Sequence, residues 1–289
     1  MASRAEWIEG ARLRTLPAAL APVLVGTGAA AQLDAASPVR ALLAAGVALS
    51  LQVGVNYAND FSDGVRGTDV DRVGPMRLTA SGAARPEQVR MAAVLSFGVG
   101  AVLGLVLVAL SGHWWLLAVG ALAILGAWYY TGGRRPYGYL GLGEVGVFVF
   151  FGLVAVLGTT YTQADRISWP ALLGAVGVGF LACALLMVNN IRDVPGDAVV
   201  GKHTLAVRIG ERRARRVYAW LVGLAMALGL ACAVVAPAAL LLVMLLPVAG
   251  ILIGTVLLGA RGVLLRPVLA GTGLLELGYG LLLGLGLAV

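Results

Sequence analysis

Two clusters of Asp and Asn side chains, each following a long apolar stretch, have the composition of a metal-binding site. The first contains Asn59, Asp60, Asp63, Asp69 and Asp71, and the second contains Asn189, Asn190, Asp193 and Asp197. Mg²⁺ prefers hard oxygen ligands and is commonly held by one or two carboxylates together with substrate phosphate oxygens. Because the chain has only two His residues, the clusters indicate Mg²⁺ and diphosphate chemistry rather than a zinc site.

The spacing within each cluster places its side chains on one face of a helix. Asn59 and Asp63 are four residues apart, and Asn56 precedes Asn59 by three. Asp193 and Asp197 repeat the four-residue spacing. Residues three and four apart are neighbours on an α-helix. If both apolar stretches continue as helices through the clusters, two opposed polar faces could hold Mg²⁺ with a diphosphate as the shared ligand.

The elements that position these clusters are predicted to be transmembrane helices. Hydrophobic residues make up 60% of the chain and charged residues 12%, and a bilayer core of ~30 Å needs about 20 apolar residues per helix. Nine stretches qualify, near 16–33, 38–58, 90–111, 113–131, 141–162, 169–190, 216–236, 238–260 and 267–288. The sequence therefore predicts an all-α polytopic membrane protein with one transmembrane domain, 1–289.

The distribution of basic residues predicts which ends of these helices face the cytoplasm. Of the 21 basic residues, only Arg40 and Arg166 fall on the other side when the N-terminus is placed inside. Both acidic clusters and the loops at about 59–89, 131–140 and 191–215 then lie on the cytoplasmic side of a bacterial plasma membrane. The net charge of +7 is explained by this topology, and no nucleic acid partner is expected. Glu6 and Glu9 dilute the basic N-terminal region, so we expect the first span to be retained rather than cleaved as a signal peptide.

Four basic residues near the clusters are candidates to bind a diphosphate, namely Arg77, Arg134, Arg135 and Lys202. For each Arg the alternative is a surface residue that sets topology. Lys202 differs because it is the only lysine. Gly196, Gly201 and Lys202 have the spacing of a P-loop start, but His203 replaces the required Ser or Thr and no strand precedes it, which excludes that reading.

Tyr137 and Tyr139 flank the third predicted cytoplasmic loop and have two interpretations. Tyr side chains gather at membrane interfaces as an aromatic belt. Alternatively, their rings form a wall beside a carbocation or an aromatic substrate, because ring faces stabilise positive charge. The sequence leaves both interpretations open.

At these residues the chain resembles the UbiA superfamily of intramembrane aromatic prenyltransferases, and within it the 1,4-dihydroxy-2-naphthoate polyprenyltransferase branch of menaquinone biosynthesis. The likeness covers most of the chain. It rests on the segments Arg14-Thr15-Leu16-Pro17, Asn59 to Asp69, Asp71 to Arg77, Tyr130 to Glu144, Asn189-Asn190-Ile191-Arg192-Asp193, Asp197 and Gly201 to Leu205. Gly67 stands where the broad superfamily has a third Asp, and the naphthoate branch shows this change with the acid at Asp69. This departure favours the naphthoate branch and makes the role of Asp60 less certain.

The resemblance implies nine transmembrane helices around a central cavity that is capped on the cytoplasmic side and open laterally to lipid. It implies Mg²⁺-dependent transfer of a polyprenyl group from its diphosphate to 1,4-dihydroxy-2-naphthoate, with loss of CO₂ and formation of demethylmenaquinol. The implied catalytic residues are Asp63, Asp69, Asp193 and Asp197. The implied metal ligands are the same four with Asn59 and Asp60. The candidate substrate contacts are Asn56, Tyr137, Tyr139, Asn189 and Asn190.

Two other functions remain compatible with the sequence. The acceptor could be a different aromatic compound used by the same superfamily, because acceptor choice depends on pocket shape. The chain could instead be a transporter, since intramembrane Asp, Asn and Arg also bind ions there. Both clusters lie at one face rather than at the midplane, which argues against transport. The expected partners are the two substrates and membrane lipids, with no obligate protein partner.

Overall fold

The computed structural model describes residues 2–68 and 76–289, and within these ranges the chain contains helices, turns and loops but no strand. The helices in chain order are α1 Arg4–Gly10, α2 Leu16–Gln32, α3 Pro38–Arg66, α4 Pro86–Ser111, α5 Leu116–Tyr129, α6 Gly143–Val147, α7 Ala155–Ala164, α8 Trp169–Val199, α9 Leu205–Ile209, α10 Glu211–Ala231, α11 Leu246–Leu257 and α12 Leu265–Ala288. The all-α prediction is confirmed.

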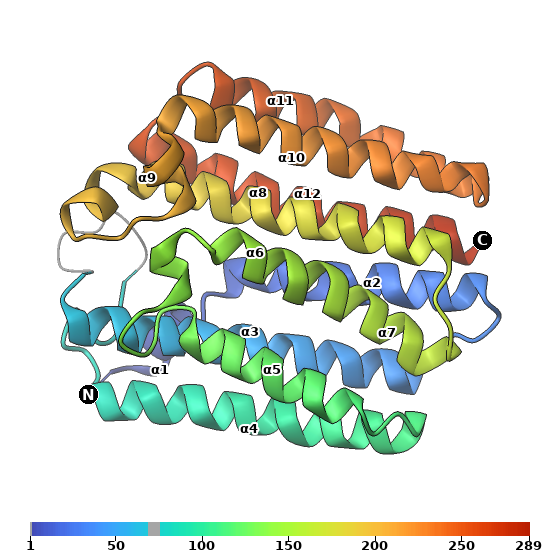
Figure 1. Cartoon of the computed structure of the whole chain (residues 1–289), viewed down its shortest axis with the longest axis horizontal. Helices are drawn as coiled ribbons and strands as arrows, with labels where there is room; N and C mark the ends of the chain where they lie inside the picture. Colours follow the sequence, from blue (N-terminus) through green and yellow to red (C-terminus); the bar gives the residue numbers. More distant parts are fainter. Residues whose placement is uncertain (1, 69–75) are drawn as a thin grey trace.

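The long helices run alongside one another, with the short helices α1 and α9 at one end of the bundle (Figure 1). The chain starts at that end and its C-terminus lies at the opposite end. In the described residues eight helical stretches are long and apolar enough to span a membrane. Of the nine predicted spans, only 113–131 is not among these eight stretches. Its helix, α5, has 14 residues and would cover about 21 Å at 1.5 Å per residue.

Two membrane helices extend beyond the predicted spans and carry the acidic clusters on their last turns. Helix α3 continues to Arg66 and ends where Gly67 adopts a left-handed conformation, with φ of 71°, which glycine tolerates without a Cβ penalty. Helix α8 continues to Val199 and passes through Pro195. Asn59, Asp60 and Asp63 of the first cluster and all of the second cluster are therefore helical, as their four-residue spacing predicted, while Asp69 and Asp71 lie outside the described residues.

The predicted span at 141–162 is one helical rod in which the hydrogen-bond pattern changes. Helices α6 and α7 are joined by a π-helical segment, Phe148–Val154. Such segments widen the helix and are frequent at functional sites. Phe150 and Phe151 are adjacent in this segment, and both line the central cavity.

Close helix contacts in the core depend on glycine. A Cβ on Gly28 of α2 would lie 2.1 Å from the carbonyl oxygen of Gly284 on α12. No side chain fits there, so the two helices pack backbone to backbone, which is the usual role of small residues between membrane helices. This contact holds α12 against α2 in the middle of the bundle, between α10 and α4 (Figure 1).

Candidate active site

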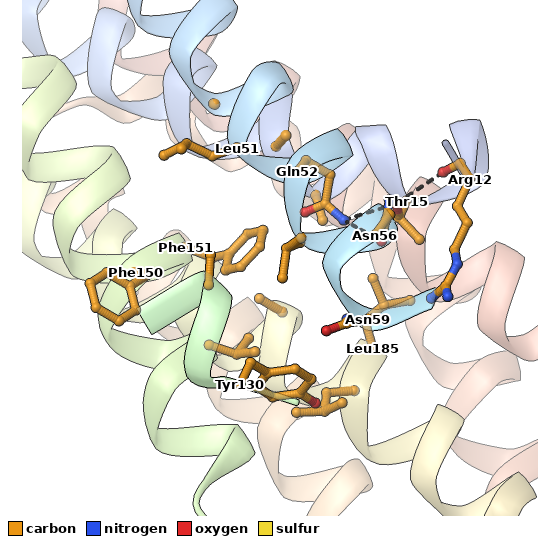
Figure 2. Close-up of a pocket in the computed structure, with 18 of the residues that line it drawn as sticks. Arg12, Thr15, Leu51, Gln52, Asn56, Asn59, Tyr130, Phe150, Phe151 and Leu185 are labelled. Carbon is orange, nitrogen blue, oxygen red and sulfur yellow. Dashed lines mark hydrogen bonds between the residues drawn. The ribbon is translucent and has the colours of Figure 1, made fainter. Parts of the chain in front are cut away.

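Both acidic clusters open onto one cavity of about 1090 Å³ inside the bundle. Asn59 and Asp63 reach it from α3, and Asp193 and Asp197 reach it from α8. The other predicted site residues on its wall are Asn56, Arg77, Tyr137, Tyr139, Asn189, Asn190 and Lys202. Away from this polar end, the wall is mostly apolar and includes Leu51, Phe150, Phe151 and Leu185 (Figure 2).

Asp63 lies where three segments meet at the end of α3. Its Oδ1 accepts a hydrogen bond of 2.5 Å from the Tyr139 hydroxyl. Its Oδ2 lies 3.3 Å from Lys202 Nζ and 3.9 Å from a terminal guanidinium nitrogen of Arg77. The carboxylate is 3% exposed, and a buried charge requires partners of this kind.

Tyr139 is fixed by contacts on its hydroxyl and on its ring face. Lys202 Nζ lies 4.8 Å from the ring centroid and the Arg66 guanidinium 5.4 Å from it, within the range of cation–π attraction. Burial, and next the negative charge of Asp63, raise the pKa of the Tyr139 phenol above its ordinary range. The hydroxyl therefore remains protonated and keeps donating to Asp63.

The loop that carries Tyr139 is tied to the first cluster at two further points. Arg66 donates to the backbone carbonyls of Thr131 and Gly133. The Thr131 hydroxyl donates to Asn59 Oδ1 at 2.7 Å. These bonds place the loop across the cluster end of the cavity.

A second loop connects the two clusters. The Lys202 backbone N–H donates to the Asp197 carbonyl at 2.8 Å, and the His203 N–H donates to the Tyr139 carbonyl at 3.0 Å. The Lys202 side chain then extends to Asp63. One short segment after α8 therefore bridges both acidic helices.

The carboxylate of Asp60 is engaged elsewhere. Its two oxygens accept hydrogen bonds from the backbone N–H groups of Leu78 and Thr79, at 2.8 and 2.9 Å. It is fully buried and lies outside the described lining of the cavity. These contacts hold the loop after α3 against the helix. Both oxygens are thus bonded to the loop, and the role of Asp60 as a metal ligand stays a prediction.

Asp193 of the second cluster is paired with a residue of its own helix. Arg192 contacts both oxygens of Asp193, at 2.7 and 2.8 Å, and also donates to Asn189 Oδ1 at 2.9 Å. One turn away, the Asn190 amide donates to Glu144 of α6 at 3.2 Å. These bonds fix the amide side chains that face the cavity.

The donors that face the cavity fit Mg²⁺ by type. They are carboxylate and amide oxygens, with cations nearby to meet a phosphate. In the described ranges there is no group of three His, Cys, Asp or Glu side chains placed to hold a metal by themselves. Asp69, predicted as a ligand, lies outside the described residues. A site of this kind requires phosphate oxygens to complete the coordination, as is usual for Mg²⁺.

The remaining predicted residues occupy different environments. Arg134 and Arg135 are exposed and lie outside the described cavity lining, so their role in diphosphate binding stays a prediction. The Tyr137 hydroxyl donates to the Gly126 carbonyl at 2.9 Å, and burial raises the pKa of Tyr137 to about 12. Asn56 donates to the backbone of Ala11 and to Thr15.

Some residues of the site were missed by sequence reasoning. Arg66 was counted only as a topology-setting charge, yet it organises the loop above the cluster. Gln52 extends the polar stripe of α3 by one turn, since it precedes Asn56 by four residues. That spacing was available in the sequence. Phe150 and Phe151 carried no signal, because they lie in a uniformly apolar stretch.

Comparison with known proteins agrees with this geometry. Residues 19–271 match the UbiA prenyltransferase family. The chain is 53% identical over 281 residues to a 1,4-dihydroxy-2-naphthoate octaprenyltransferase of Mycobacterium tuberculosis, covering 97% of this chain and 96% of the relative. It is 42% identical over 221 residues to the Escherichia coli protein of the same name, covering 74% and 72%.

Solved structures share the fold at low sequence identity. A UbiA homologue from Aeropyrum pernix K1 gives a TM-score of 0.71 at 18% identity, covering 94% of this chain and 96% of that one. A UbiA homologue from Archaeoglobus fulgidus, solved with GPP and Mg²⁺, gives 0.67 at 14% identity, covering 96% and 99%. The chain is a multi-pass membrane protein that belongs to the UbiA prenyltransferase family, as its motifs predicted.

Proposed function

We propose that the protein transfers a polyprenyl group from polyprenyl diphosphate to 1,4-dihydroxy-2-naphthoate, with loss of CO₂, and forms demethylmenaquinol in menaquinone biosynthesis. The observation that carries this proposal is a single cavity with acidic helix ends and cationic side chains at one end and an apolar wall beyond them. The relatives named for this reaction, at 53% and 42% identity, support the choice of acceptor.

The acidic end of the cavity would bind the diphosphate. Asn59, Asp63, Asp193 and Asp197 supply oxygen ligands for Mg²⁺, and Asp69 is proposed to join them. The bound ion would neutralise charge that develops on the leaving diphosphate. The A. fulgidus homologue solved with GPP and Mg²⁺ supports this assignment. Lys202 and Arg77, now paired with Asp63, would donate to phosphate oxygens.

The reaction balances without a strong base. The allylic C–O bond breaks and its electron pair leaves with the diphosphate. The ring carbon that bears the carboxylate forms the new bond to the allylic carbon. The bond from that ring carbon to the carboxylate then breaks, its electrons restore the aromatic ring, and CO₂ departs. Negative charge passes from the carboxylate to the diphosphate, so no proton has to be removed.

The chain's contribution is to position the substrates and to exclude water. Water would capture an allylic cation, so the loop that carries Tyr139 and the loop that carries Lys202 would close the polar end during reaction. The apolar wall would hold the prenyl chain. We also propose that this end faces the cytoplasm, because 19 of the 21 basic residues fall on that side.

Purified protein in nanodiscs, with Mg²⁺, octaprenyl diphosphate and 1,4-dihydroxy-2-naphthoate, tests the proposal by mass spectrometry. We expect a prenylated quinol and loss of all product when a chelator is added. Parallel reactions with 4-hydroxybenzoate and homogentisate test the acceptor. Turnover of one of these in place of the naphthoate would contradict the proposed substrate while keeping prenyl transfer. Absence of product with every acceptor would contradict the proposed function.

A further inference from the structure

A small polar network lies on the cavity wall beyond the acidic clusters (Figure 2). Thr15, just before α2, and Gln52 and Asn56 of α3 form it. The Gln52 amide nitrogen lies 2.9 Å from the Thr15 hydroxyl and 3.4 Å from Asn56 Oδ1. The Asn56 amide nitrogen lies 2.9 Å from the same hydroxyl and 2.9 Å from the Ala11 carbonyl.

The direction of each hydrogen bond in this network is fixed by the backbone. The Ala11 carbonyl can only accept, so Asn56 must present its NH₂ group there and turn its oxygen toward Gln52. The Thr15 hydroxyl donates to the Arg12 carbonyl at 2.9 Å and therefore accepts from both amides. Gln52 must then present its NH₂ group to Thr15 and Asn56. A flipped Gln52 amide would set its oxygen against the Asn56 oxygen.

This polarity leaves the Gln52 side-chain oxygen on the cavity side. Gln52 lines the cavity and is only 7% exposed. In the part of the chain that the structure describes, its Oε1 has no hydrogen-bond partner. Figure 2 shows this oxygen on the side of the amide away from Thr15. A buried acceptor without a donor is costly, and because less than 1 Å² of this oxygen is exposed, a donor in the cavity would reach it as the neighbouring side chains move apart.

The walls near Gln52 suit a flat aromatic ring. Phe150 and Phe151 lie across the pocket from α3, and Leu51 lies beside Gln52 (Figure 2). Ring faces and aliphatic side chains contact an aromatic substrate without competing for its hydroxyls. A phenolic O–H held between these walls would supply the donor that Gln52 Oε1 lacks.

We propose that Gln52 determines acceptor specificity by accepting a hydrogen bond from a ring hydroxyl of the aromatic substrate, with Thr15 and Asn56 as positioning residues that fix its orientation. This inference rests on the proposed function, which supplies an acceptor with two hydroxyls. A site built to bond a hydroxyl discriminates strongly against an analogue that lacks it, because the buried acceptor is then left unpaired. Gln52 would thus contribute to binding and choice of the aromatic acceptor, with no role in breaking the allylic C–O bond of the prenyl diphosphate.

The test compares binding of hydroxynaphthoates by wild-type protein and Gln52 variants in nanodiscs. Equilibrium titrations use 1,4-dihydroxy-2-naphthoate, 1-hydroxy-2-naphthoate and 4-hydroxy-2-naphthoate, under anaerobic conditions. Wild-type protein should bind one of the two monohydroxy analogues about 10- to 100-fold more weakly than the dihydroxy compound. That analogue identifies the hydroxyl that Gln52 accepts from.

Two substitutions separate the hydrogen bond from the shape of the side chain. Gln52→Met keeps the length but removes the acceptor, so it should bind all three compounds with affinities within about 3-fold of one another. Gln52→Glu keeps the shape but sets a carboxylate oxygen against the Asn56 oxygen, so it should lose the fixed orientation and with it the preference for the dihydroxy compound. The KM for prenyl diphosphate should be unchanged in both, which also reports that they fold.

Gln163→Met is the matched control. Gln163 is a buried glutamine of α7 that bonds Thr27 and the backbone of Ser37, outside the described cavity lining. It should discriminate among the three compounds as wild-type protein does. If Gln52→Met retains wild-type discrimination, the inference is overturned, whether or not the naphthoate is turned over. If wild-type protein binds the compounds as expected but forms no product, the proposed function fails and the hydroxyl contact stands.

Discussion

Asp63 of the α3 cluster is bonded by residues from distant parts of the chain, whereas the described bonds of Asp193 in the α8 cluster come from its own helix. Asp63 bonds Tyr139 and Lys202, which lie 76 and 139 residues away along the chain. Asp193 bonds the adjacent Arg192. The two clusters resemble each other in sequence and face the same cavity, yet the described bonds of Asp63 tie surrounding loops to α3, whereas those of Asp193 stay within α8.

This difference shows that position on the helix decides the role of an Asp in these clusters. Asp60 and Asp63 are three residues apart and both buried, but Asp60 bonds the loop backbone and Asp63 opens onto the cavity. The α3 cluster therefore combines a structural carboxylate with one that is proposed to be catalytic.

The largest expected effect is the loss of a cavity-facing carboxylate from either cluster. Asp63→Asn and Asp193→Asn should each lower turnover at saturating Mg²⁺ by at least about 100-fold, because each removes charge that would bind the metal and diphosphate. Asp165→Asn, at an exposed carboxylate that pairs with His113, is the control and should retain activity. Full activity in either cluster variant would contradict the metal assignment.

Asp60→Ala separates the structural role from the chemical one. It leaves the N–H groups of Leu78 and Thr79 without their acceptor and should destabilise the fold by about 1–3 kcal/mol. The midpoint of thermal unfolding in detergent should fall, while turnover per folded molecule drops by less than about 10-fold. Loss of all turnover with an unchanged midpoint of thermal unfolding would instead indicate that Asp60 is a metal ligand.

Tyr139→Phe tests whether the α3 cluster depends on the loop above it. The substitution removes the hydrogen bond to Asp63 and keeps the ring between Lys202 and Arg66. We expect a loss of about 1 kcal/mol of transition-state stabilisation, which corresponds to roughly a 5-fold fall in kcat/KM for prenyl diphosphate. Steady-state kinetics measure it, and Tyr129→Phe, at an exposed tyrosine, is the control. An unchanged kcat/KM would mean that Asp63 is positioned without this loop.

The smallest effect expected is the pH dependence of the contact that anchors the same loop to α5. Burial raises the pKa of Tyr137 to about 12, against about 10 in an unfolded chain. Its contribution to stability is therefore fully present below pH 10 and is lost as the pH rises toward 12. Unfolding midpoints of wild-type protein and Tyr137→Phe should converge over that interval. If the difference between the two unfolding midpoints stays constant up to pH 12, the raised pKa of Tyr137 is contradicted.

Much of this arrangement could be predicted because it depends on periodicity. The nine apolar stretches, the extension of helix past Asp63 and through the second cluster, and the common face of Asn56, Asn59 and Asp63 all follow from spacing. The roles of Asp60 and Arg66 could not be predicted, because their partners are backbone groups of loops that fold back onto α3. Backbone acceptors and donors have no sequence signature. The π-helical segment at Phe148–Val154 could not be predicted either, because it lies within a continuous apolar stretch.

The measurement that tests the central claim most directly is the stoichiometry of the reaction with carboxyl-labelled 1,4-dihydroxy-2-naphthoate. Prenylated quinol, labelled CO₂ and diphosphate are quantified together, with wild-type protein and with Asp63→Asn. We expect the three products in equal amounts from wild-type protein, none after chelation and at most traces from the variant. Prenylated product that retains the labelled carboxylate, or equal yields from both proteins, would contradict the account.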